Sequence, residues 1–326
     1  MNRPDVSVII PVYNAAKYIE KCIDSILSQS VENIEVVAVN DCSADDSAAV
    51  LERMASADPR IKVINKERNE GSMMARHTGY NAAEGRYFAF VDADDYLPDG
   101  ALKKLLDKAV ESKADIVAGD FDLIKPDGSA VRKTRHDHLT DNPDSYMRFI
   151  LTGGGNALWG SLFSRRLFDE YEYPAIMHQG FADDRIVLTT MLVKARPSIA
   201  VLADTAYCYV VNYESMTREN FDFVKERKVL TALYFCYNLL NGLTDKFRAE
   251  NDAFLSRYIS LYIERGHPVR EVPGYNDDIE RLLSFASLKQ TLGLRLAFHT
   301  RMCESLPLYG RMCASARVKI RRWLGK

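Results

Sequence analysis

Apolar segments of strand length alternate with helical patterns near the start of the chain, and this alternation leaves few folds open. Four segments are short, nearly continuous apolar runs with the length of buried strands: 6–10, 34–39, 61–64 and 87–91. Apolar residues recur at helical spacing in the intervals between them: after Asn14, after Ser43 and over 72–83. Because buried strands joined by helices form sheets covered on both faces, we predict an α/β fold with a mostly parallel sheet flanked by helices.

The pattern changes along the chain, which predicts two domains. Pro98 starts a further helix, and the turn at 125–128 predicts a β-hairpin. From Phe223 onward the pattern is mostly helical. We therefore expect an α/β domain over residues 1–220 and a helical C-terminal extension over residues 221–326.

The composition excludes several classes of protein. Of 326 residues, 47% are hydrophobic and 27% are charged, which suits a globular chain. A net charge of −2 gives no overall attraction to nucleic acid. Six cysteines without a C-x-x-C pair indicate neither a disulfide framework nor a zinc site. The N-terminal residues lack the hydrophobic stretch of a signal peptide, and no run of about 18 apolar residues can span a bilayer, so we expect a cytoplasmic protein.

Positive charge is concentrated towards the C-terminus. Residues 281–326 hold ten Lys or Arg and one acid, Glu304, while Leu288, Leu292 and Leu296 recur at helical spacing. A basic amphipathic segment of this kind predicts peripheral contact with an anionic membrane surface. A solvated helical face or a contact between copies of the chain explains the same pattern, so these interpretations stay open.

Two acidic residues follow the fourth predicted strand. Strand residues two apart share a face, so Asp92 and Asp94 are expected to project together where the strand ends. Paired carboxylates suit Mg²⁺ or Mn²⁺, which such sites hold together with substrate phosphates. The alternative is that these acids cap the helix that begins near Pro98.

Residues after the second and third strands form another candidate site. Asp41 directly follows a strand, and its carboxylate can accept a hydrogen bond from a nucleobase or a ribose hydroxyl. Gly71 stands beside the start of the next helix, where it permits close approach of a ligand, and Arg76 lies one turn further on. Capping of the helix after Ser43, by Asp41 or by Ser43 itself, is the competing interpretation.

A third acidic pair, Asp183 and Asp184, precedes the apolar helical run 186–193. As capping residues they would start that helix. As a functional pair they would supply a carboxylate that removes a proton from a hydroxyl during group transfer. The residues alone leave both interpretations open.

Together these segments resemble the inverting family 2 glycosyltransferases of the Rossmann-like GT-A fold. The resemblance is carried by blocks that occur in order along the chain: Ser7-Val-Ile-Ile-Pro-Val-Tyr-Asn14, Asp41-Cys-Ser-Ala-Asp45, Asn69-x-Gly71 with Ala75-Arg76, Asp92-Ala-Asp94-Asp95, and Asp183-Asp184. Each block is weak alone, and their common order makes the joint match specific.

The resemblance implies a metal-dependent enzyme that moves a sugar from a nucleoside diphosphate, by resemblance UDP, to an acceptor hydroxyl with inversion. Residues from several of these blocks would hold the donor: Pro11, Val12, Tyr13, Asn14, Asp41, Gly71, Arg76, Asp92 and Ala93. Asp94 and Asp92 would bind the divalent cation, Mn²⁺ or Mg²⁺. Asp184 would act as the catalytic base. The acceptor would be a saccharide or lipid-linked saccharide of a cell-surface polysaccharide or lipopolysaccharide, and a lipid-linked acceptor would make membrane contact by the basic C-terminus useful.

Two residues depart from the family pattern. Cys42 replaces a glycine, so we expect that this position cannot need a conformation restricted to glycine without strain. Asp183 replaces a glutamate, which makes Asp183 a rival of Asp184 for the role of base.

Other functions share parts of this pattern. A nicotinamide-dependent dehydrogenase is excluded, because residues 11–16 replace the glycine-rich turn that its first strand requires. A sugar nucleotidyltransferase would also hold a nucleotide and a metal at strand ends, but it would release pyrophosphate. A non-catalytic carbohydrate- or nucleotide-binding protein with the same fold is the third alternative, and measured turnover distinguishes it.

Overall fold

Two compact units make up the chain, Met1–Phe254 and Leu255–Lys326. The computed structural model describes seven stretches of them: 3–125, 127–134, 142–152, 157–169, 182–211, 223–264 and 269–283. The domain boundary proposed between residues 220 and 221 lies outside the described residues.

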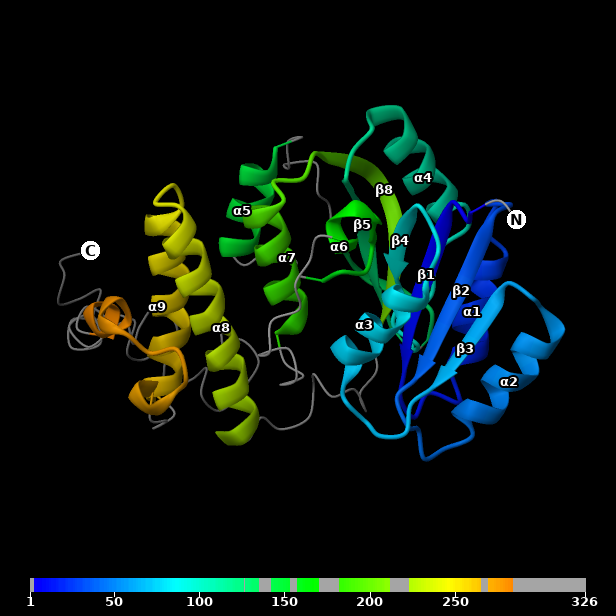
Figure 1. The fold of residues 1–326 in the computed structure, drawn as a ribbon, viewed down its shortest axis with the longest axis horizontal. Coiled ribbons are helices and arrows are strands. Elements are labelled where there is room, and N and C mark those ends of the chain that lie inside the picture. The colour runs from blue at the N-terminus through cyan, green and yellow to red at the C-terminus, as the bar shows by residue number, and fades with distance from the viewer. Residues whose placement is uncertain are drawn as a thin grey trace, which may run out of the picture. The chain divides into compact units, whose positions relative to one another are not determined.

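The first half of the central sheet consists of four parallel strands. Their order across the sheet is β3 (Ile61–Asn65), β2 (Ile34–Asn40), β1 (Val6–Val12) and β4 (Tyr87–Phe90), as Figure 1 shows. The connecting helices are α1 (Ile19–Leu27), α2 (Ser47–Ala57) and α3 (Ser72–Ala82). The strands and helices predicted for this region are confirmed.

The second half of the sheet mixes strand directions. It contains β5 (Ile116–Ile124), β6 (Ala130–Thr134), β7 (Ser161–Ser164) and β8 (Ile199–Val210). β7 lies antiparallel between β4 and β5, β6 pairs antiparallel with β5, and β8 pairs parallel with β5. In the described residues, β6 and β7 therefore run against the other strands of an eight-stranded sheet. The predicted mostly parallel sheet is confirmed, and the hairpin predicted around residues 125–128 joins β5 to β6.

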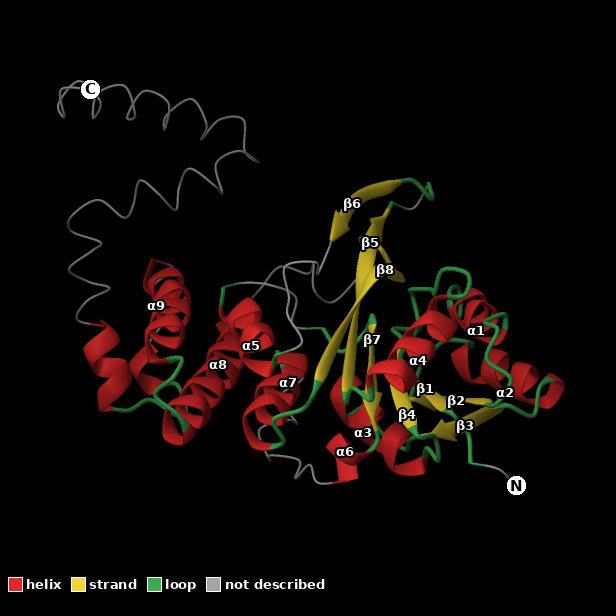
Figure 2. Ribbon diagram, turned by 90° about the horizontal axis from the view of Figure 1, so that it is seen from above, coloured by secondary structure: helices red, strands yellow, loops and turns green. Residues whose placement is uncertain are grey.

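The side chains of β1 point alternately to the two faces of the sheet, and both faces are covered. This explains why almost all of its residues are apolar. Val8 and Ile10 belong to the core that includes residues of α1, α2 and α4 (Ala101–Ser112), whereas Ile9 points towards α3 on the opposite face. A Cβ at Gly79 of α3 would lie 2.5 Å from Ile9 Cγ2, so this close approach requires glycine. Figure 2 shows α1, α2 and α4 on one side of β1, β2 and β4, and α3 on the other. Both faces of β1 are therefore buried.

The remaining described helices come after the hairpin. They include α5 (Pro143–Leu151), α6 (Arg166–Asp169), α7 (Asp183–Lys194), α8 (Phe223–Leu243), α9 (Arg248–Glu264) and the 3₁₀ helix η2 (Val269–Glu271), and residues 277–283 are helical as well. The helical pattern predicted from Phe223 onward is confirmed for the residues that the structure describes. Within those residues, no helix combines the length and the apolar composition needed to cross a bilayer.

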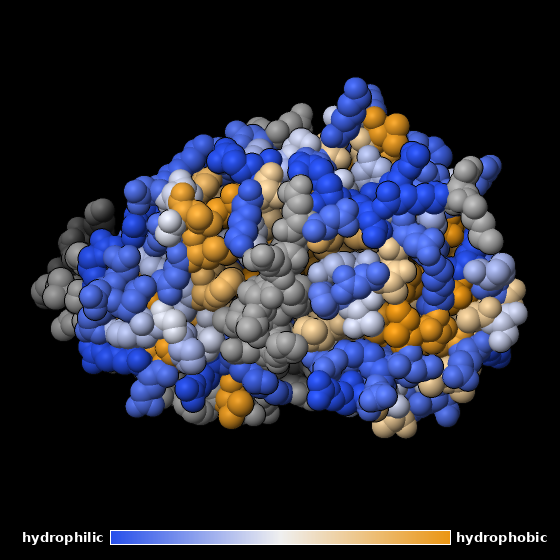
Figure 3. All heavy atoms as spheres, viewed as in Figure 1, coloured by the Kyte–Doolittle hydropathy of each residue, from blue (hydrophilic) through white to orange (hydrophobic). Residues whose placement is uncertain are grey.

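α8 exposes some of its apolar side chains. Val224 and Leu243, near its two ends, are 60% and 55% exposed. Figure 3 shows apolar side chains over α8 and over the strands beside α3, on a face that is otherwise mainly hydrophilic. Scattered exposed apolar residues of this kind are usual on globular proteins.

A buried carboxylate ties β2 to its neighbours near the amino ends of the strands. Glu35 accepts hydrogen bonds from the Ser7 hydroxyl (2.5 Å) and from the backbone N–H groups of Glu84 (2.5 Å) and Gly85 (3.1 Å). Lys62 Nζ lies 2.8 Å from its second oxygen. Burial opposes ionisation, but the hydrogen bonds from Lys62, Ser7 and Glu84 outweigh it, so the pKa of Glu35 is lowered.

Replacing this carboxylate should destabilise the fold in a pH-dependent way. We expect Glu35→Gln to lower the free energy of unfolding by about 1.5–3 kcal/mol at pH 7, the usual value of a hydrogen bond to a charged group. Because the folded-state pKa is lowered, this stabilisation is present above the unfolded-state pKa and is lost as pH falls through the folded-state value. Urea unfolding at pH 7 and pH 3 measures it. The exposed Glu32→Gln is the control, and an equal loss in both variants at pH 7 would contradict the assignment.

Candidate active site

The carboxyl ends of β1 and β2 meet at one edge of the sheet, and the loops that follow them are joined. Asp41 N–H donates to the carbonyl of Val12 (2.8 Å). Asn14 N–H donates to Ser43 Oγ (3.0 Å), and Ala44 N–H donates to Asn14 Oδ1 (2.8 Å). The two loops therefore form one surface where ligands gather in sheets of this kind.

The four predicted donor-binding residues of the first loop occupy different positions. Pro11 and Val12 are the last residues of β1, whereas Tyr13 is 48% exposed. Asn14 has φ 50°, a left-handed conformation that asparagine tolerates. Tyr13 and Asn14 are both exposed, so their side chains are available to a ligand.

The segment after β2 corrects the capping interpretation and shows strain at Cys42. α2 begins at Ser47 and its N-cap, Asp46, makes no side-chain capping hydrogen bond, so neither Asp41 nor Ser43 caps this helix. Cys42 has φ 59°, in the left-handed region that costs a non-glycine residue roughly 1–2 kcal/mol. The cysteine therefore adopts a conformation that glycine takes without cost, and it does so under strain, as expected for this position.

Asp41 organises the loop before α3. It is 2% exposed and accepts hydrogen bonds from the backbone N–H groups of Glu70 (3.1 Å) and Gly71 (2.7 Å). Lys66 Nζ lies 3.1 Å from the same carboxylate. Gly71 is the N-cap of α3 with φ 90° and ψ 161°, a conformation almost restricted to glycine. Asp41 and Gly71 thus come together, and the backbone itself requires the glycine.

Arg76 joins two of the predicted acidic sites. Its Nη2 lies 2.5 Å from Asp92 Oδ1, and its Nη1 lies 3.3 Å from Asp184 Oδ1. The arginine is only 6% exposed. Burial opposes its charge, but the carboxylates of Asp184 and Asp92 outweigh burial and raise its pKa. The structure therefore brings α3, the end of β4 and the start of α7 together around one guanidinium.

The acidic residues after β4 form a turn rather than a continuation of the strand. β4 ends at Phe90, and Asp95 N–H donates to the Asp92 carbonyl (3.0 Å). Asp92 and Asp94 are partly exposed, while Ala93 between them is 7% exposed. The expectation that strand alternation places both carboxylates is therefore wrong. The capping alternative is also wrong, because α4 begins at Ala101 without a side-chain capping bond.

Asp95, the last residue of this acidic turn, is buried, with 3% of its surface exposed. Burial and the negative charges of Asp92 and Asp94 raise its pKa to about 8, against the hydrogen bonds that it accepts. No three His, Cys, Asp or Glu side chains within the described stretches are grouped to hold a metal ion by themselves. The donor set of Asp92 and Asp94 fits a hard divalent cation that also takes phosphate oxygens, since two carboxylates and excess negative charge are what such a shared site requires.

Asp183 and Asp184 lie in the first turn of α7, where acidic side chains interact favourably with the helix dipole. Asp183 is 5% exposed, whereas the side chain of Asp184 is 25% exposed and contacts Arg76. Burial raises the pKa of Asp184, Arg76 and the Leu158 N–H oppose that rise, and Asp92 adds to it. Asp184 is therefore connected to Asp92 through the guanidinium of Arg76.

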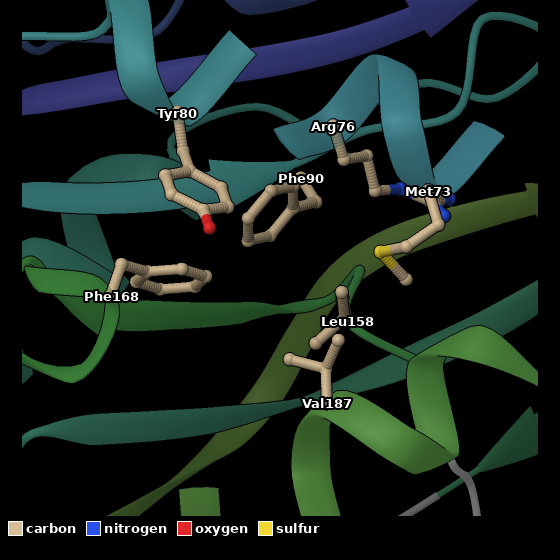
Figure 4. A pocket seen from close by; sticks show the side chains of 7 residues that line it. All are labelled: Met73, Arg76, Tyr80, Phe90, Leu158, Phe168 and Val187. Carbon is tan, nitrogen blue, oxygen red and sulfur yellow. The ribbon is translucent and has the colours of Figure 1, made fainter. Parts of the chain in front are cut away.

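A small apolar pocket lies beside the guanidinium. In Figure 4 the rings of Tyr80, Phe90 and Phe168 lie opposite Leu158 and Val187. The full set of side chains that line the pocket is Met73, Arg76, Tyr80, Phe90, Leu158, Phe168 and Val187. Burial raises the pKa of Tyr80 to about 12. An apolar wall of this kind excludes water and strengthens the ion pairs of Arg76.

Two contributors to this site carry no sequence signal. Lys66 pairs with Asp41 and with Glu70 (2.6 Å), yet a single lysine after a strand looks like any solvated side chain. Tyr207 of β8 contacts the acidic turn from 112 residues beyond Asp95 in the chain. Neither residue belongs to a motif, and in each case contacts distant in sequence create the role.

Removing the guanidinium should destabilise the fold. Arg76→Met keeps an unbranched apolar side chain along the pocket but leaves Asp92 and Asp184 without their shared cation. We expect a loss of about 1–3 kcal/mol in the free energy of unfolding, the cost of leaving partly buried polar groups unsatisfied. Arg53→Met is the matched control, because Arg53 pairs with Glu20 at an exposed site, where an ion pair contributes little to stability. Urea unfolding that gives equal values for both variants would contradict the bridging role.

Known structures resemble this fold at low sequence identity. Staphylococcus aureus TarS 1–349 in complex with UDP-GlcNAc matches with a TM-score of 0.62 and 21% identity, over 80% of this chain and 73% of that one. The mannosyltransferase PcManGT of Pyrobaculum calidifontis, in complex with GDP-Man and Mn²⁺, matches with a TM-score of 0.55 and 18% identity, over 98% and 88% of the two chains. At this identity the likeness concerns the fold.

Sequence comparisons identify the family. The model described as glycosyl transferase family 2 matches residues 7–172. The chain is 30% identical to glycosyltransferase GlyA of Streptococcus pneumoniae over 65% of its own length, but this match spans only 31% of GlyA. It is also 30% identical to the succinoglycan biosynthesis protein ExoO of Rhizobium meliloti, over 75% of this chain and 72% of ExoO. The chain belongs to glycosyl transferase family 2.

Proposed function

We propose that this protein is a glycosyltransferase that moves a sugar from a nucleoside diphosphate to an acceptor hydroxyl. The observation that carries the proposal is the bridge from Asp92 through Arg76 to Asp184, at the strand edge of a family 2 fold. Through this bridge, Asp92, a suitable metal ligand, and Asp184, a suitable base, are both paired with the guanidinium of Arg76. The transfer reaction needs both carboxylates close together.

The donor is a nucleotide sugar, with UDP as the proposed nucleotide. Similar structures carry UDP-GlcNAc and GDP-Man, which supports a nucleoside diphosphate in a fold of this kind. In this chain the proposed donor surface is the pair of joined loops after β1 and β2, from Pro11 to Asn14 and around Asp41. Gly71 and Arg76 border it on α3, and Ala93 adds backbone groups from the acidic turn.

A divalent cation is proposed at Asp94 and Asp92. Mn²⁺ is present in the similar mannosyltransferase structure, and the partly exposed carboxylates of this chain are suitable oxygen ligands. When bound, such a cation would offset the charge of the diphosphate and of the departing group.

Asp184 is the proposed base. Its partial exposure lets a substrate hydroxyl approach, and its raised pKa keeps it nearer to the pH at which a base works well. The acceptor hydroxyl gives its proton to the carboxylate, its oxygen bonds to the anomeric carbon, and the bond from that carbon to the diphosphate oxygen breaks. A single displacement inverts the anomeric centre. Asp183 is the rival for this role, although it is more deeply buried.

The proposed setting is the assembly of a cell-surface polysaccharide or lipopolysaccharide in the cytoplasm. ExoO is named for the biosynthesis of succinoglycan, which supports a saccharide or lipid-linked saccharide as acceptor. Because the match to GlyA covers only 31% of that protein, the acceptor is proposed without reference to GlyA. The basic segment proposed to touch a membrane surface falls almost wholly in residues 284–326, outside the described residues.

A donor panel tests the proposed reaction. UDP-, GDP- and dTDP-sugars are incubated with the protein and Mn²⁺ or Mg²⁺, with and without EDTA, and free nucleoside diphosphate is measured. We expect release from one donor that EDTA abolishes. Pyrophosphate from a nucleoside triphosphate and a sugar phosphate would instead indicate a nucleotidyltransferase. Donor binding without release of nucleoside diphosphate in the presence of each acceptor tested would indicate a non-catalytic binding protein.

Substitution of the base should separate binding from chemistry. We expect Asp184→Asn to lower kcat by about 10²–10⁴-fold, the usual value of general-base assistance, with the affinity for the donor unchanged in calorimetry. Asp183→Asn is the matched comparison and should lose much less activity. A normal rate in Asp184→Asn together with a large loss in Asp183→Asn would reverse the assignment.

A further inference from the structure

The acidic turn 92–95 is held from outside its own strand. After β4 ends at Phe90, the backbone of Tyr96 pairs in both directions with Cys208 of β8: Tyr96 N–H donates to the Cys208 carbonyl (3.4 Å), and Cys208 N–H donates to the Tyr96 carbonyl (3.0 Å). The turn therefore depends on β8 for its placement, although β8 pairs with β5 in the sheet.

Tyr207 makes the most direct connection between β8 and this turn. Its hydroxyl accepts a hydrogen bond from Asp92 N–H (3.1 Å) and donates one to Asp95 Oδ2 (2.7 Å). Val210 N–H donates to the other oxygen, Asp95 Oδ1 (2.7 Å). One hydroxyl thus links the backbone of the first residue of the turn to the side chain of the last.

The ring that carries this hydroxyl is itself fixed. Tyr207 is fully buried, and the indole of Trp159 stacks on it with centroids 4.6 Å apart and an interplanar angle of 14°. Phe121 meets the indole edge-on at 4.7 Å. Such aromatic contacts restrict the tyrosine to one orientation, so the position of its hydroxyl is set by β5, β8 and Trp159 rather than by the turn that it contacts.

We propose that Tyr207 is a positioning residue for the divalent cation, which it serves by holding the turn that presents Asp92 and Asp94. This inference rests on the proposed function in that it takes those two carboxylates as metal ligands. Groups that orient metal ligands without touching the metal typically contribute 10–100-fold to metal affinity or activity. A phenylalanine would keep the aromatic stack but remove both hydrogen bonds of the hydroxyl.

The test compares two tyrosine hydroxyls that donate to aspartates. Tyr207→Phe removes the one on the acidic turn. Tyr237→Phe removes one within the helical region, where Tyr237 donates to Asp252 (2.8 Å) and does not touch the turn. For each variant, the unfolding temperature is followed as Mn²⁺ is added at a fixed UDP concentration, and the Mn²⁺ dependence of kcat and KM is measured.

We expect Tyr207→Phe to need about 10–100-fold more Mn²⁺ for the same stabilisation by Mn²⁺ and UDP, with Tyr237→Phe unchanged from wild type. High Mn²⁺ should restore much of the lost kcat, which a general loss of folding would not allow. Equal Mn²⁺ requirements in Tyr207→Phe and wild type would overturn the proposal.

Asp95→Leu provides a second variant if Tyr207→Phe does not fold. A leucine has a similar shape but accepts no hydrogen bond, so the bonds from Tyr207 and from Val210 are both lost, and the same rise in the Mn²⁺ requirement is expected. A wild-type Mn²⁺ response in this variant would overturn the proposal. Mn²⁺-dependent stabilisation of the wild type without sugar transfer would contradict the proposed function alone, whereas no Mn²⁺ response in the wild type would overturn the positioning role.

Discussion

The buried guanidinium of Arg76 is the interaction on which the site depends. It is reached by Asp92 at the end of β4 and by Asp184 at the start of α7, residues that are 92 positions apart in the chain and that would repel each other without it. The helix that carries the arginine, α3, packs closely on β1 at Gly79. The sheet, one helix and two acidic segments thus converge on a single positive charge.

Several carboxylates surround Arg76, and its single positive charge does not neutralise all of them. Asp92 is paired and Asp94 is partly exposed, while burial, together with the negative charges of Asp92 and Asp94, raises the pKa of Asp95. A site with this excess attracts cations, while the loops after β1 and β2 supply backbone and hydroxyl groups beside it. The arrangement suits a diphosphate that arrives with a divalent ion. The apolar wall of the pocket beside Arg76 lowers the polarity around the guanidinium.

Much of the fold follows from local sequence patterns, because strands such as β1 are buried on both faces and must be apolar throughout. That Asp41 and Asp92 lie at the same edge of the sheet is also predictable, since residues after parallel strands meet at one edge. The turn at Asp92–Asp95 was not predictable from alternation, because hydrogen bonds with β8 replace the strand geometry. The left-handed conformation of Cys42 and the role of Tyr207 depend on neighbours far away in the chain, so no local pattern could indicate them.

The position of Mn²⁺ in a crystal of the protein with UDP is the most direct measurement, since anomalous scattering locates the ion independently of the protein model. The expected result is an ion coordinated by Asp94 or Asp92 and by the diphosphate, with Arg76 still bridging to Asp184 and the nucleoside on the loops after β1 and β2. An ion bound away from the acidic turn, or a nucleotide bound away from those loops, would contradict the proposed site.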